Sequence, residues 1–380
     1  MKVVHITTVH NPFDTRIFEK MCKSAVVAGW DVTLVASHDR DETIDGVKIL
    51  SLPRQSNRLK RVALSIPRAI RLANSVRADI YHIHDPELLL GLRFLAPPGV
   101  AIYDMHENMA GSIKHKKWIP RSLRNVTSNL WTSVESALLK RVPIIFAERS
   151  YQREYPWASC SEVVLNMPKS EQLMAMQSGS RVSGQLMYVG TVSADRGSLM
   201  TLRALQVLQR QRNDVEFVCI GPINPKHQEE LESFITQAGL KKVRFLGRMR
   251  SADAWRVAAE GHIGLATLLP KPNYVESYPT KLFEYMAIGL PVIASNFPLY
   301  REIVETAGCG ICVDPESPEQ IAAAIAAILE DPRMASEMAR RGQEAALQRF
   351  RWDIEAEKLK LFYGRVLARA KPSSRLIASS

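Results

Sequence analysis

Two glutamates and a lysine stand close together in a stretch whose residue types could hold a phosphorylated sugar, Val275–Ser295. Lys281 and Glu284 are three residues apart, so in a helix both would project from one side of the first turn, with Glu276 in the loop just before it. A helix N-terminus beside a lysine favours phosphate, and two carboxylates can accept hydrogen bonds from the hydroxyls of a sugar or a ribose. The stretch therefore predicts a binding site for a sugar nucleotide.

The turn-forming residues of the same stretch predict the elements that carry these side chains. Pro279 and Thr280 suit the opening turn of a helix, and Gly289 suits its left-handed end. The apolar run Leu290–Ala294 has the character of a short buried strand. A loop, a short helix and a strand are therefore expected in that order.

The spacing of the two glutamates resembles the motif of a known family. Glu276 and Glu284 enclose seven residues, and a Met-Ala-x-Gly-x-Pro-Val-Ile-Ala run follows. This is similar to the E-x7-E motif of retaining GT-B glycosyltransferases, family 4 in particular, which includes bacterial polysaccharide and glycoconjugate glycosyltransferases. The resemblance covers about residues 2–365. It implies an α/β fold of two Rossmann-like domains facing across a cleft, with a C-terminal helix that crosses back to the first domain.

The length of the chain also favours two domains, because a chain of 380 residues is longer than those that usually fold around a single hydrophobic core. Val163–Pro168 is typical of a hinge between them. We expect an N-terminal acceptor domain, a C-terminal nucleotide-sugar donor domain, a crossing helix and a tail, at residues 1–166, 167–350, 351–370 and 371–380 respectively.

A turn after a predicted strand corresponds, by the same resemblance, to the G-R-x4-K-G turn that binds the donor diphosphate in the family. Here it reads Gly190-Thr-Val-Ser-Ala-Asp-Arg196-Gly197, so Arg196 takes the place of the lysine and Thr191 that of the arginine. Gly190 and Thr191 are kept as donor-binding positions. Lys281 or Arg196 must then supply more of the positive charge.

The resemblance assigns the remaining contacts of the donor as well. Glu284 would hold the ribose hydroxyls and Glu276 the sugar. Gly221 and Arg248 lie in loops after two further predicted strands and would flank the nucleobase.

The first predicted strand, Lys2–Thr8, leads into a polar turn where many relatives in the family carry paired glycines that approach a phosphate. This chain has no glycine there and offers Asn11, Asp14 and Arg16, so Arg16 is the candidate for charge at the phosphate. The residues alone leave an alternative, in which Asp14 caps the next helix and Arg16 pairs with Glu19 or another neighbour.

A histidine follows the predicted strand Val100–Tyr103. The family carries a histidine at this position, directed into the cleft. The resemblance therefore assigns His106 to a hydroxyl of the donor sugar, near the reacting carbon, with Asp104 and Glu107 in support. The alternative is a histidine that forms hydrogen bonds only inside its own loop.

Two short patterns could bind a metal, but neither is complete. His82-Ile-His84-Asp85 ends a predicted strand, where alternate residues face one way and could share an ion, yet no further ligands complete a metallohydrolase set. Cys309 and Cys312 form a C-x-x-C without a second pair, and the five cysteines are scattered. We therefore expect no metal and no cofactor, with a nucleoside-diphosphate sugar used as donor substrate.

The chain is basic, with a net charge of +11 and a pI near 9.5. Residues 54–153 hold 17 Lys and Arg against 7 acids. The sequence shows no zinc-finger spacing, aromatic stacking platform or recognised nucleic-acid module, so a nucleic-acid partner is not expected. An anionic membrane surface or a lipid-diphosphate acceptor explains the bias more simply, with the amphipathic run Arg54–Arg77 and the basic segment Gly111–Trp131 as candidate contacts. An ordinary surface helix has the same pattern.

The sequence also bears on where the protein acts. It contains no apolar run long enough to span a bilayer, and its first nine residues show no signal-peptide cleavage pattern. We expect a cytoplasmic protein that associates peripherally with the inner face of the cell membrane.

These features together predict a retaining hexosyltransferase that moves a sugar from a nucleoside diphosphate to an acceptor hydroxyl, on a lipid-linked saccharide in surface polysaccharide synthesis. The leaving group is a diphosphate, so the main catalytic demand is to stabilise negative charge, which Lys281 and Arg196 at a helix end can do without a metal. Three alternatives stay open: a sugar-nucleotide epimerase on the same fold, a non-catalytic nucleotide-binding partner of a membrane enzyme, and a metallohydrolase.

Overall fold

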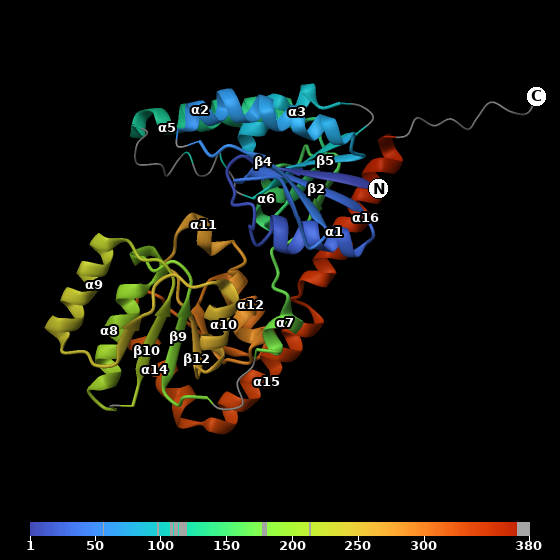
Figure 1. The fold of residues 1–380 in the computed structure, drawn as a ribbon. Helices are drawn as coiled ribbons and strands as arrows, with labels where there is room; N and C mark the ends of the chain where they lie inside the picture. The colour runs from blue at the N-terminus through green and yellow to red at the C-terminus, as the bar shows by residue number, and fades with distance from the viewer. Residues whose placement is uncertain are drawn as a thin grey trace, which may run out of the picture. The chain divides into compact units, whose positions relative to one another are not determined.

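The computed structural model describes residues 1–370 except 56, 97–98, 107–108, 110–112, 114–119, 177–180 and 213. The chain divides into two compact units, one made of Met1–Asn166 together with Glu355–Ser380 and the other of Met167–Ile354 (Figure 1). The first boundary lies within the predicted hinge, and the second falls inside the last helix. In the described part of the chain, no helix combines the length and the apolar character needed to cross a bilayer.

The first unit is built on an eight-stranded sheet with the order β3-β4-β2-β1-β5-β6-β7-β8. Neighbouring strands are parallel except β3 and β4, which pair antiparallel. The chain adds strands in opposite directions on the two sides of β1, so the carboxyl ends of β1 and β5 form a switch point where sheets of this kind bind ligands. The strands are β1 (Lys2–Ile6), β2 (Asp31–Ser37), β3 (Glu42–Ile44), β4 (Val47–Leu52), β5 (Ile80–Ile83), β6 (Val100–Met105), β7 (Ile144–Phe146) and β8 (Ser161–Val163).

Helical segments cover both faces of this sheet, which explains why its central strands β1 and β5 are buried at almost every position. Right-handed crossovers place the connections that lead to β5, β6 and β7 on one face, and η3 contacts both α3 and α5 there. The segments are η1 (Ile17–Cys22), α1 (Lys23–Val27), α2 (Arg58–Lys60), η2 (Arg61–Ser65), α3 (Ile66–Val76), η3 (Pro86–Phe94), α5 (Arg121–Leu139) and α6 (Arg149–Glu154).

The last helix, α16 (Trp352–Ala370), contributes most of its length to the first unit. The fully buried Tyr363 lies against the ring of Trp30 at 5.6 Å between centroids, and its hydroxyl is 2.5 Å from Nδ1 of His82. The carboxylate of Glu355 accepts a hydrogen bond from the backbone N–H of Leu165 at 2.8 Å. The C-terminal end of the described chain is thereby part of the first unit's core.

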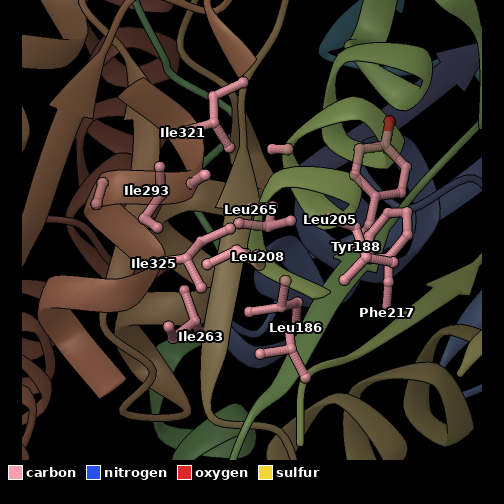
Figure 2. Packing of buried hydrophobic residues seen from close by; sticks show 14 of the residues in the cluster. Leu186, Tyr188, Leu205, Leu208, Phe217, Ile263, Leu265, Ile293, Ile321 and Ile325 are labelled. Atoms are coloured by element: carbon pink, nitrogen blue, oxygen red, sulfur yellow. The ribbon is translucent and has the colours of Figure 1, made fainter. Parts of the chain in front are cut away.

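The second unit contains a six-stranded parallel sheet with the order β11-β10-β9-β12-β13-β14. Its core includes Leu186, Phe217, Leu265 and Ile293 from the strands, with Leu205 from the helix that follows β9 (Figure 2). Here the switch point lies between β9 and β12. The strands are β9 (Gln185–Val189), β10 (Glu216–Ile220), β11 (Val243–Phe245), β12 (Ile263–Ala266), β13 (Val292–Ser295) and β14 (Gly310–Val313).

Local sequence signals set the starts of several helices in the second unit. Asn224, Ser317 and Asp331 accept hydrogen bonds from backbone N–H groups at three N-termini, each followed directly by proline. The helices are α7 (Ser170–Met174), η4 (Ala194–Arg196), α8 (Ser198–Gln209), α9 (Pro225–Ala238), α10 (Ser251–Ala259), α11 (Pro272–Val275), α12 (Thr280–Ala287), α13 (Pro298–Ala307), α14 (Pro318–Glu330) and α15 (Pro332–Gln348).

The architecture confirms the predicted α/β class with two Rossmann-like units. The loop, helix and strand expected in Val275–Ser295 are present, and Gly289 has the left-handed φ of 74° that ends α12. The strand there begins at Val292, two residues later than predicted. Two short strands, β3 and β8, were not predicted.

Candidate functional site

Three glycines bring the turns at the carboxyl ends of β9, β10 and β12 close together. Gly190 and Gly221 have φ values of 125° and 152°, and a Cβ on Gly221 would lie 2.0 Å from the carbonyl oxygen of Gly190. A Cβ on Gly197 would lie 2.0 Å from the carbonyl oxygen of Thr267. Only glycine fits at these approaches, so the predicted donor turn is a tightly packed backbone structure.

Two cationic side chains meet beside this backbone. The position that a Cβ would take on Gly190 is 3.4 Å from Nζ of Lys281 and 3.6 Å from Nη1 of Arg196. Arg196 comes from η4 and Lys281 from the first turn of α12. The structure therefore brings Gly190, Arg196 and Lys281 together, as the sequence predicted.

The ammonium group of Lys281 is buried and has no hydrogen-bond partner among the described residues. It lies over the ring of Tyr188, 3.7 Å from the centroid. Burial, together with the neighbouring charge of Arg196, lowers the pKa of Lys281 to about 7, and Glu284 opposes this shift. A buried cation without a hydrogen-bond acceptor, next to a second cation, is an arrangement that an anionic ligand would stabilise.

Tyr285 fixes α12 against the end of β9. Its hydroxyl accepts a hydrogen bond from the backbone N–H of Val189 at 2.8 Å and donates to the carbonyl oxygen of Met187 at 3.2 Å. The position of Lys281 relative to Gly190 is set by this contact. The roles of Tyr188 and Tyr285 could not be predicted from the sequence, because both depend on which strand the helix packs against.

The two glutamates differ in their surroundings. Glu284 is half-buried on α12, where its charge acts on Lys281, whereas Glu276 is exposed at the C-terminal end of α11. The helix α11 is tied to the donor turn, because Lys271 at its start is 3.3 Å from a carboxylate oxygen of Asp195. Both glutamates thus stand on elements that border the turn.

Of the other predicted donor residues, Thr191 and Arg248 are exposed and Gly221 is half-buried. The carbonyl oxygen of Thr191 accepts a hydrogen bond from the Tyr188 hydroxyl at 2.8 Å, and its side chain is exposed. The N–H of Gly221 donates to the carbonyl oxygen of Gly247 at 2.8 Å, which brings the exposed Arg248 next to that turn.

In the first unit, Arg16 and Asp104 form a buried ion pair at the switch point. Nε donates to Oδ2 at 3.0 Å and Nη2 donates to Oδ1 at 2.8 Å. Burial favours the neutral acid, but Arg16 and His106 hold the pKa of Asp104 well below its usual range. This pairing differs from the phosphate role predicted for Arg16, because two of its donors are committed to Asp104.

The alternative interpretation of the first turn is right for one residue and wrong for the other. Asp14 accepts hydrogen bonds from the backbone N–H groups of Arg16 and Ile17, at 2.8 and 2.9 Å, so it does cap the first helical segment. Glu19, the partner suggested for Arg16, instead pairs with Lys23 at 2.7 Å.

His106 belongs to a cluster of side chains around the same carboxylate. Its Nε2 is 2.6 Å from Oδ2 of Asp104 and 3.1 Å from Nδ1 of His84. His84 in turn contacts His5 at 2.9 Å, and burial lowers the pKa of both well below the usual value. The predicted support from Asp104 is present, and Glu107 lies outside the described residues. His84 was not predicted as a neighbour of His106. The alternation in His82-Ile-His84, which places both histidines on one side of a strand, is the sequence signal that indicates its position.

A cavity of about 240 Å³ opens beside this cluster. His84, His106 and Asp85 contribute to its lining, together with His10 and Arg61. Asp85 accepts hydrogen bonds from the hydroxyls of Thr7 and Thr8, each at 3.0 Å, which fixes the loop after β1. The first unit therefore presents, at its switch point, a cavity whose lining includes histidine and charged side chains.

Within the described residues, two groups have the spacing of metal ligands, His5–His82–His84 and His84–Asp104–His106. In the second group, Arg16 donates to the same Asp104 oxygen that would bind an ion. A guanidinium already supplies positive charge at that oxygen, which disfavours a cation there.

The chain is similar in sequence to known glycosyltransferases. Residues 182–345, inside the second unit, match the model of the family described as Glycosyl transferases group 1. The chain is 24% identical over 295 residues to a phosphatidyl-myo-inositol mannosyltransferase of Mycobacterium leprae, covering 75% of this chain and 73% of the relative. It is 27% identical over 157 residues to an alpha-D-kanosaminyltransferase of Streptomyces kanamyceticus, covering 40% and 38%.

Solved structures share the fold. A sucrose-phosphate synthase from Thermosynechococcus elongatus matches with a TM-score of 0.73 and 17% identity, covering 97% of this chain and 99% of the other. Anabaena HepE, solved in complex with UDP-glucose, matches with a TM-score of 0.73 and 17% identity, covering 96% and 100%. The solved structures show the GT-B fold, and the family match of the second unit together with the named relatives supports a glycosyltransferase. The predicted enzyme class is therefore confirmed.

Proposed function

We propose that this glycosyltransferase moves a hexosyl group from a nucleoside diphosphate to an acceptor hydroxyl, with retention of anomeric configuration. The observation that carries the proposal is the buried Lys281 ammonium, which lacks a hydrogen-bond partner among the described residues and stands beside Arg196 at the Gly190 turn. UDP-glucose in the structure of HepE supports a nucleotide sugar as donor. The retaining E-x7-E motif supports the stereochemistry.

In this mechanism the chain stabilises the departing diphosphate. As the glycosidic bond breaks, negative charge develops on the leaving oxygen, and Lys281 and Arg196 are already in place to balance it. Glu284 holds the ribose hydroxyls and Glu276 the sugar, while Gly221 and Arg248 flank the nucleobase. No metal is required for this charge balance.

We assign His106 to a hydroxyl of the transferred sugar. Its ring is fixed by Asp104 and His84, so it can offer one defined hydrogen-bonding edge. Arg16 acts through Asp104 as a positioning residue, because the ion pair fixes the carboxylate that orients the histidine.

We propose a lipid-linked saccharide as the acceptor. The lipid mannosyltransferase of M. leprae supports a lipid-linked substrate, and WaaG, named as a glycosyltransferase of lipopolysaccharide biosynthesis, shares the fold with a TM-score of 0.72. Neither the epimerase nor the non-catalytic partner is favoured by any feature of the described residues.

A panel of nucleotide sugars tests the donor site directly. At a concentration one hundred times its dissociation constant, the correct donor is expected to stabilise the protein by about 2.7 kcal/mol, measured by thermal unfolding. Addition of an acceptor saccharide should then yield a glycosylated product. Product formed from the donor alone would indicate an epimerase, and a panel without any thermal shift would contradict the donor site.

The affinity for the donor is expected to fall as the pH rises above 7. Lys281 has its pKa lowered to about 7 in the free protein, and a bound diphosphate would raise it again, so binding takes up a proton above pH 7. The dissociation constant should therefore increase towards roughly tenfold per pH unit between pH 7 and 9, measured by calorimetry. The variant Lys281→Met should lose this dependence, and a wild-type affinity that stays constant across the range would contradict the assignment.

A further inference from the structure

A histidine outside the predicted donor residues reaches the donor turn, Gly190–Gly197, from the helix that follows β10. His227 lies in the first turn of α9, and its Nε2 is 2.8 Å from Oγ of Ser198, the first residue of α8. Its Nδ1 is 2.9 Å from a carboxylate oxygen of Glu230, three residues further along α9. The helices α8 and α9 lie side by side (Figure 1). His227 therefore connects α9 with the residue that directly follows the donor turn.

The carbonyl oxygen of Ser193 accepts two hydrogen bonds inside this turn. The hydroxyl of Ser198 donates to it at 3.0 Å, and the backbone N–H of Arg196 donates to it at 3.0 Å. This carbonyl thereby closes η4, the short helical turn that carries the guanidinium of Arg196. The position of one of the two donor-site cations thus depends on where Ser198 directs its single hydrogen.

The hydrogens available to these groups fix the direction of each bond. A serine hydroxyl has one hydrogen, and because that of Ser198 goes to the carbonyl of Ser193, its oxygen can only accept from His227. An ionised carboxylate such as that of Glu230 can likewise only accept, so His227 donates from both ring nitrogens. The complete set of bonds therefore requires the imidazolium form of His227, and a neutral ring would leave one bond unmade.

The order of serine, histidine and glutamate is also that of a hydrolase triad, in which the serine hydroxyl donates to the histidine and acts as a nucleophile. Ser198 does not have these properties. It is only 4% exposed, and its hydrogen goes to the carbonyl of Ser193 and not to His227. This chain of hydrogen bonds is therefore suited to holding a turn in place.

A backbone contact links the donor turn to the same loop and helix at a second place. The N–H of Val192 donates to the carbonyl oxygen of Pro222 at 2.9 Å, and Val192 pairs with Ile223 in an isolated bridge. Pro222 and Ile223 lie between β10 and α9, in the loop expected to flank the nucleobase. This loop and the donor turn are thus joined through the backbone at Val192 and through side chains at His227.

We propose that His227 is a positioning residue for the donor diphosphate. It acts through Ser198 and the carbonyl of Ser193 on Arg196, so that the guanidinium is held beside Lys281 before the donor binds. The inference rests on the proposed function, because it takes Arg196 as one of the groups that balance the charge of the diphosphate. It adds a residue from α9, outside the two motifs that predicted the donor site.

Steady-state kinetics test this role, with the nucleotide sugar that most stabilises the wild type against thermal unfolding as the donor. His227→Leu removes both ring donors, and kcat/KM for the donor is expected to fall about tenfold, as for the loss of one hydrogen bond. Ser198→Ala should cause a similar loss. His227→Gln should recover most of the activity, because its amide nitrogen is as many bonds from the backbone as Nε2 and can donate to Ser198.

A double-variant cycle with Arg196→Met separates positioning from a general structural effect. If His227 acts through Arg196, His227→Leu should change kcat/KM by less than about twofold once the guanidinium is absent. A histidine that only supports the structure would cause the same loss in both backgrounds, and that result would overturn the proposal.

The matched control is Gln228→Leu, at the next residue of α9, where the amide donates to Glu232 in an exposed hydrogen bond of 2.8 Å. It should leave kcat/KM within about twofold of the wild type. An equal loss in Gln228→Leu and His227→Leu would contradict the positioning role. Thermal unfolding without donor verifies that each variant is folded. A wild type that no nucleotide sugar stabilises would refute the proposed function itself, whereas a stabilised wild type with unchanged kinetics in His227→Leu would refute only the role of His227.

Discussion

Replacing Lys281 by methionine is expected to lower kcat by roughly 100- to 1000-fold while the protein stays folded. The ammonium lies at the Gly190 turn with Arg196 as its cationic neighbour, so its loss removes about half of the charge that balances the leaving diphosphate. Methionine keeps the aliphatic length that packs over Tyr188. Initial rates of product formation at saturating donor measure the effect.

The control for this variant is Lys271→Met. Lys271 also lies near the donor turn, but its side chain is 47% exposed and its ammonium pairs with Asp195. We expect its kcat to stay within a few-fold of the wild type, because a screened surface pair contributes little. Turnover of Lys281→Met close to that of Lys271→Met would remove Lys281 from the diphosphate site.

Stability gives a second readout of the same residue. Since the folded protein lowers the pKa of Lys281 from 10.5 to about 7, the unfolded chain binds one more proton between these values, and wild-type stability should rise with pH across that window. Lys281→Met should lack this rise, and at pH 7 it should be no less stable than the wild type.

The single variants Arg16→Met and Asp104→Leu are each expected to destabilise the protein by about 3–5 kcal/mol. Each leaves the other charge buried without its partner, and the side chains are only 5% and 0% exposed. The double variant should cost much less than the sum of the two, because no unpaired charge remains. Chemical denaturation of all four proteins yields the coupling energy.

An exposed pair serves as the reference for this cycle. Arg301 and Glu305 lie 2.9 Å apart on α13 with both side chains more than half exposed, and Arg301→Met should change stability by at most about 0.5 kcal/mol. If the Arg16 and Asp104 effects simply add, the two residues do not act as a pair, and the positioning role proposed for Arg16 loses its basis.

Much of the fold could be predicted because local patterns specify it. The predicted strands Lys2–Thr8 and Val100–Tyr103 are present as β1 and β6, which begin at the predicted residues and end at Ile6 and Met105. The strand β3 was missed although its signal is present, since Asp45-Gly46, with φ values of 49° and 79°, is a typical hairpin turn into β4. Its three residues are too few for a periodic pattern.

The candidate site could be predicted only for those residues that belong to a recognised motif. The resemblance brought Gly190 and Lys281 together although 90 residues separate them in the chain. The partner of Arg16 was not predictable, because Arg16 lies at the start of η1 and Asp104 on β6, 88 positions further along the chain, and nothing local links the two.

The packing of α16 has a consequence for the order in which the two units can complete their cores. The ring of Tyr363 fills a place between Trp30 and His82, so the first unit receives this part of its core from the far end of the chain. During synthesis the strands of that unit leave the ribosome first. Their last packing partner, Tyr363, is added only after the whole second unit has been made. The half that begins the chain is therefore the half that is completed last.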